Sequence, residues 1–114
     1  MTTETRELLE LAAKAAGIPF VWDFWNSPEY GDTPVARAPR DQLSWNPLTD
    51  DGDALRLAVK LRLQLSIHER GCIVSLGEGE DVLGECGISV TGDINAATRL
   101  AIVRAAAEIG RAMP

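Results

Sequence analysis

Soft metal ligands and nucleophiles are few in this sequence: His68, Cys72 and Cys86 are the candidates. A structural zinc site needs four ligands, and these residues supply three. If residues 72–76 and 82–86 form a hairpin, strand alternation places His68 on the face opposite to both cysteines, so the histidine cannot activate either thiol. We therefore assign no catalytic residue, no metal site and no cofactor.

Two other patterns resemble ligand sites only in part. Asp50, Asp51 and Asp53 carry hard oxygen ligands, but Ca²⁺ needs six or more oxygens from a dedicated loop, and EF-hand spacing is absent. Capping of a helix that begins here is the favoured interpretation. The glycines within residues 77–84 alternate with acidic side chains that would repel phosphate, and no helix follows them.

The aromatic side chains form a second group of candidates, because all six lie within residues 20–45. Alternation along a strand predicts that the aromatic residues at positions 20, 22 and 24 belong to the core. Trp25 and Tyr30 are then the candidates for an exposed partner-binding surface, since tyrosine and tryptophan are favoured anchors at interfaces.

The segment Trp45–Asp51 allows two interpretations. In the first it is a structural turn, with Trp45 in the core, Asn46 bonded to the backbone and Pro47 stiffening the approach to a helix. In the second it forms a small-molecule pocket in which Trp45, Asn46 and Asp50 bind the ligand.

Composition predicts one soluble domain covering residues 1–114, with 46% hydrophobic and 25% charged residues. A net charge of −6 opposes binding to nucleic acid and to anionic membranes, and would steer the chain towards a basic partner surface. The N-terminus lacks the pattern of a secretory signal, so we expect a cytoplasmic protein with two free thiols.

Periodicity predicts the secondary structure. A helix over residues 4–16 is followed by a strand over 20–25 and by a connector with a short edge strand near Val35. A second helix begins at Asp50–Asp53 and gives way to a strand near residue 63, although a longer helix fits the same leucines. Strands over 72–76 and 82–86 and a helix over 94–111 complete the series.

Hairpin register predicts one consistent apolar face. Within the last hairpin, Cys72 lies opposite Cys86, Val74 opposite Gly84 and Leu76 opposite Val82; the preceding turn pairs Ile67 with Cys72, Leu65 with Val74 and Leu63 with Leu76. The expected fold is α+β, with a mainly antiparallel sheet of about four strands and three helices.

Two segments, WNPLTDDGDALRLA at residues 45–58 and ATRLAIVRAAA at residues 97–107, resemble the phage ABA sandwich domain family. The resemblance extends from about residue 43 to the end, whereas the segment Phe20–Pro39 follows no pattern of that family. It implies an α-β-α layered sandwich encoded by a phage or prophage, and it implies no activity.

The expected function is that of a non-enzymatic phage or prophage accessory protein in the host cytoplasm, which binds a host or phage protein. One alternative is a small-ligand-binding protein or hydrolase with its pocket near Trp45–Asp51. Another is a virion or self-assembly component that uses the Ala-rich last helix as a packing surface. Oligomeric state, the partner and the role of Phe20–Pro39 stay open.

Overall fold

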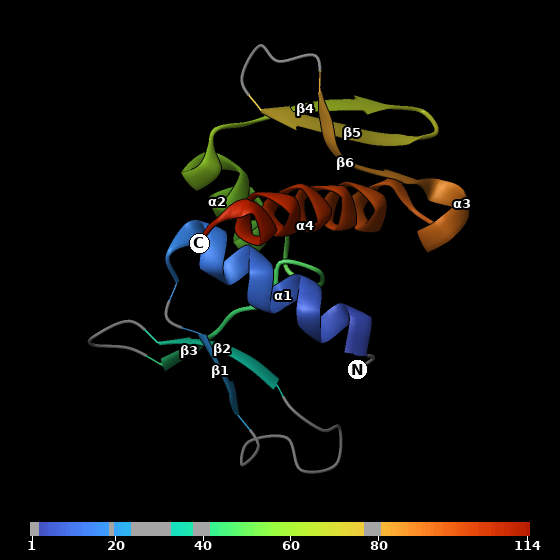
Figure 1. Cartoon of the computed structure of the whole chain (residues 1–114). Helices are drawn as coiled ribbons and strands as arrows, with labels where there is room; N and C mark the ends of the chain where they lie inside the picture. Colours follow the sequence, from blue (N-terminus) through green and yellow to red (C-terminus); the bar gives the residue numbers. More distant parts are fainter. Residues whose placement is uncertain (1–2, 19, 24–32, 38–41, 77–80) are drawn as a thin grey trace.

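The computed structural model describes residues 3–18, 20–23, 33–37, 42–76 and 81–114 (Figure 1). They form two antiparallel three-stranded sheets, ordered β1-β2-β3 and β4-β5-β6, and four helices. The elements are α1 (Thr3–Ala16), β1 (Phe20–Asp23), β2 (Thr33–Arg37), β3 (Gln42–Ser44), α2 (Asp51–Leu61), β4 (Leu63–His68), β5 (Gly71–Leu76), β6 (Val82–Gly87), α3 (Ile88–Thr91) and α4 (Ile94–Ala112).

The first sheet differs from its prediction in two respects. The predicted strand over 20–25 is present as β1, and positions 24 and 25 lie outside the described residues. The strand near Val35 is present as β2, but the prediction of an edge strand is wrong, because Val35 pairs with Val21 on one side and Ser44 on the other. The missed strand β3 has only three residues, too few to show periodicity.

The boundary between α2 and β4 confirms the predicted change of period. Asp50 caps the start of α2, where its side chain accepts a hydrogen bond from the Asp53 N–H. Arg62 ends the helix in the left-handed region (φ 56°), and its N–H donates to the carbonyls of Ala58 and Val59. β4 begins at the next residue, so the longer helix is ruled out.

The second sheet has the predicted register except at one end. All three predicted pairings of β4 with β5 are confirmed, and so are Cys72 opposite Cys86 and Val74 opposite Gly84. The pairing of Leu76 with Val82 is wrong, because an irregularity after Val74 places Ser75 opposite Val82. A bulge of this kind inserts one residue and shifts the register beyond it.

Helix α4 packs directly against this sheet and against α1. Figure 1 shows α1, α2 and α4 on the same side of the β4–β6 sheet, with α4 next to it. The α+β class and the antiparallel pairing are confirmed. The sheet has three strands where about four were expected, and the short helix α3 is additional. The layers run from the sheet through α4 to α1, with no described helix on the outer face.

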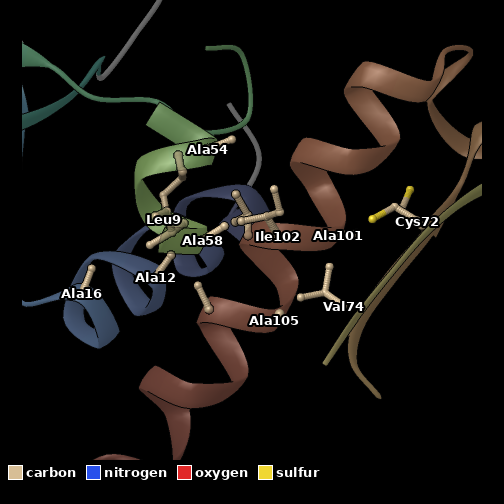
Figure 2. Close-up of a cluster of buried hydrophobic side chains, with 14 of the residues drawn as sticks. Leu9, Ala12, Ala16, Ala54, Ala58, Cys72, Val74, Ala101, Ile102 and Ala105 are labelled. Carbon is tan, nitrogen blue, oxygen red and sulfur yellow. The ribbon is translucent and has the colours of Figure 1, made fainter. Parts of the chain in front are cut away.

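Small side chains form most of the core at this junction (Figure 2). Ala12 of α1, Ala58 of α2, Ala101 and Ala105 of α4 and Val74 of the sheet are all buried. Figure 2 shows Ala12 and Ala58 on the side of α4 opposite to Val74. Gly84 of β6 lies so close to α4 that an added Cβ would overlap the carbonyl oxygen of Ala101 and approach the Ala105 nitrogen to 2.6 Å. Small side chains therefore allow these backbones to approach one another closely.

The Gly84→Ala substitution tests this contact. We expect a loss of about 2 kcal/mol or more in the free energy of unfolding, measured by urea titration, because α4 must move to admit the methyl group. Gly87→Ala on the same strand is the matched control: its Cβ would meet nothing nearer than 3.4 Å, and its backbone is extended at φ −90°. The control should change stability by about 0.5 kcal/mol or less. Equal losses in the two variants would contradict the packing described.

Candidate functional site

The turn before α2 uses its polar groups to hold its own backbone. Trp45 is buried at 6% exposure. The Asn46 side-chain oxygen accepts a hydrogen bond from the Leu48 N–H at 3.0 Å. The Asn46 N–H donates to the Asp53 carboxylate at 2.9 Å, and the Asp53 N–H donates to the Asp50 carboxylate at 2.8 Å. These contacts are those of the structural turn in the first sequence interpretation.

Arg99 ties the same turn to α4. Its Nε donates to the Leu48 carbonyl at 2.8 Å, and its Nη1 donates to the Asp51 carboxylate at 2.6 Å. The Arg99 side chain is 19% exposed, whereas that of Asp51 is 72% exposed. The contact to the carbonyl is thus the more shielded of the two, and it fixes where α2 starts relative to α4.

The predicted site residues therefore fall into two groups. Trp45, Asn46 and Asp50 lie together at the start of α2, where each has a structural role, and ligand binding by them stays a prediction. Trp25 and Tyr30 lie outside the described residues, so partner binding by them also stays a prediction.

The two cysteines lie opposite each other on β5 and β6, and both are buried free thiols. Burial raises the pKa of the Cys72 thiol above its ordinary value; hydrogen bonds with the Thr98 side chain and the Ser66 backbone oppose the rise, and Cys86 adds to it. Cys72 is therefore a poor nucleophile at neutral pH, because the reactive form is the thiolate. Among the described residues, no cluster of three or more His, Cys, Asp or Glu side chains could hold a metal ion.

A largely apolar hollow of about 300 Å³ lies between α2, β4 and the first turns of α4. We call it the β4 groove, and its apolar lining includes Leu55, Leu65, Ile67, Ile94 and Ile102. Leu55 and Ile67 are 59% and 58% exposed, although both face this hollow. Trp45, Asn46 and Asp50 are not part of its lining.

The β4 groove is not among the sites expected from the sequence. Helical spacing with Ala54, Ala58 and Leu61 predicts that Leu55 faces inward from the second helix, and hairpin register assigns Ile67 to the apolar face of the sheet. Both predictions assume that the helix and the sheet cover each other along their whole length. The available signal was the spacing of Leu55 and Val59, which follow one another by one helical turn and form an apolar stripe on α2. In the structure this stripe faces outward, and Val59 is 67% exposed.

A larger and more polar hollow of about 810 Å³ runs beside β6, between α1 and α4. Its arginines are engaged within the chain. Arg104 donates to the Glu85 carbonyl at 2.9 Å, and Arg111 pairs with Glu108 and with Glu7. This hollow therefore combines arginines engaged within the chain with the apolar side chains of Leu8, Val82 and Leu83.

Thiol labelling tests the environment of the cysteines. We expect both thiols of the native protein to react with Ellman's reagent at pH 8 about 100-fold or more slowly than those of the chain in concentrated guanidinium chloride, because burial hinders access and lowers the thiolate fraction of Cys72. The native rate should rise with pH. Reaction of both thiols at the unfolded rate would show that β5 and β6 do not enclose them.

Comparison with known proteins identifies no relative: no family model, no curated protein and no solved structure matches the chain. The resemblance to the phage ABA sandwich domain family accordingly stays a prediction. No helix within the described part of the chain is long and apolar enough to cross a membrane.

Proposed function

We propose that this chain is a non-enzymatic accessory protein that acts by binding another protein, and that the β4 groove is the surface which the partner covers. The exposure of Leu55 and Ile67 on either side of one apolar hollow is the observation that carries the proposal. Single exposed apolar residues are ordinary, but a contiguous apolar hollow is typical of an interaction site. Burying either side chain fully contributes about 1–2 kcal/mol to association.

The phage or prophage origin and the cytoplasmic location belong to the same proposal. Their support is the resemblance of residues 45–58 and 97–107 to a phage family. Trp25 and Tyr30 are further proposed contact residues, on the strength of their side-chain types.

The two alternative functions have weaker support. A ligand pocket at Trp45, Asn46 and Asp50 would compete with the hydrogen bonds that hold the turn. Self-assembly through the Ala-rich helix would need its alanines at the surface, whereas Ala101 and Ala105 are fully buried.

Affinity capture tests the proposed surface. The tagged protein and a Leu55→Gln/Ile67→Thr variant are used as baits in lysate of the host cell, with quantitative mass spectrometry as the readout. We expect the double variant to bind the partner about tenfold more weakly or worse, because both changes remove apolar contact without adding charge.

Val90→Thr is the matched control, because Val90 is 66% exposed but lies on α3 and is not part of the groove lining. It should retain the partner, and all three proteins should unfold at similar temperatures. A partner retained equally by the double variant would place the binding surface elsewhere. Failure of the wild-type protein to retain any partner would contradict the proposed function itself.

A further inference from the structure

β4 is an edge strand, and within the described part of the chain β5 is its only ladder partner. Backbone groups of an antiparallel strand point alternately towards one neighbour and the other. The Ile88 N–H donates to the Arg70 carbonyl at 2.8 Å, which directs the backbone groups of Ile73 towards β4. With the observed register, the N–H and C=O groups of Leu65 and Ile67 point to the open edge.

The same two residues direct their side chains into the β4 groove. An extended segment that pairs with them would place every second side chain on the same face of the sheet, over the hollow. Strand addition of this kind combines main-chain hydrogen bonds with pockets for alternate side chains. The open edge and the apolar hollow are thus suited to one and the same extended ligand.

The charge around β4 is opposite in sign to that of the whole chain. The two charged residues that line the groove, Asp51 and Arg99, pair with each other at 2.6 Å. The residues that flank β4 in the chain, Arg62, Glu69 and Arg70, carry a net charge of +1, whereas the whole chain carries −6. Arg56 pairs with Asp53 at 2.8 Å. Lys60, Arg62 and Arg70 are exposed, and none of them forms an ion pair with another described residue.

A second copy of this chain fits the edge poorly. Two β4 edges related by a twofold axis would bring the basic side chains of both copies together, and like charges oppose association. The β6 strand of a second copy could continue the same face of the sheet only by running parallel to β4, because β4 and β6 are both antiparallel to β5. The Glu85 carbonyl of that edge already accepts a hydrogen bond from Arg104.

We propose that β4 binds an extended, acidic segment of a partner protein as a fourth strand, with alternate apolar side chains in the β4 groove. This proposal rests on the proposed function and names the chemistry of its partner. It reverses the expectation, drawn from net charge, that a partner surface would be basic, because the charge beside the groove governs the contact.

Two blocked synthetic peptides of about seven residues test the proposal, one alternating valine with glutamate and the other alternating valine with lysine. NMR titration should show that the glutamate peptide binds about tenfold or more tightly than the lysine peptide, and that added salt weakens this binding. Amide exchange at Leu65 and Ile67 should slow by about tenfold in the complex, because both N–H groups gain a partner.

Two variants separate charge at the groove from net charge. Arg62→Asn/Arg70→Gln should weaken binding of the glutamate peptide by about tenfold, because these two residues flank β4, and asparagine suits the left-handed backbone of position 62. Lys14→Gln removes a basic charge from α1 instead, and should leave the affinity unchanged.

Equal binding of the two peptides, binding of neither, or protection at the β6 edge in place of Leu65 and Ile67 would overturn the proposal. Binding of neither peptide, or protection at the β6 edge, leaves the proposed function intact if the Leu55→Gln/Ile67→Thr variant still loses the natural partner. If that variant still binds the natural partner and the glutamate peptide with unchanged affinity, both the proposed function and this proposal are overturned.

Discussion

The close packing of α4 against β6 on one side and α1 on the other is the constraint on which the rest of the structure depends. It requires glycine where two backbones meet. Gly84 of β6 lies against the Ala101 carbonyl of α4, and Gly110 of α4 lies against the Leu11 carbonyl of α1. Alanines fill the remaining space. Because interiors tolerate little change of volume, this junction has one stable arrangement. The helix then places Arg99 on the turn before α2 and Arg104 on the edge of β6.

The proposed binding surface follows from the same arrangement. α4 lies closest to β6, so its cover is incomplete beneath β4, at the far edge of the sheet. Val74 on the central strand is fully buried, whereas Ile67 on β4 is 58% exposed on the same face. The first turn of α4 and the outward leucine of α2 border the space that results. An apolar hollow, an open edge and locally basic side chains therefore occur together.

Patterns within short segments predicted much of this fold. The features that they missed depend on how separate segments pack against one another. The change of period at Leu63, the aspartate cap of α2 and most of the β4–β6 register could be read from neighbouring residues. The bulge after Val74 has no local signal, since either strand could accommodate the extra residue. The β4 groove depends on where α4 crosses the sheet, which no single segment encodes. The predicted turn residues proved to hold the chain together, while the predicted aromatic contacts lie outside the described residues.

Native-state hydrogen exchange would test the central role of α4 most directly. We expect the amides of residues 101–107 to exchange only through global unfolding, with an exchange free energy equal to that from denaturant titration, because this helix contacts α1, α2 and the β4–β6 sheet. The Leu65 and Ile67 amides of the isolated protein should exchange far faster. Exchange of α4 through a local opening, with β5 still protected, would contradict the view that the fold is organised around this helix.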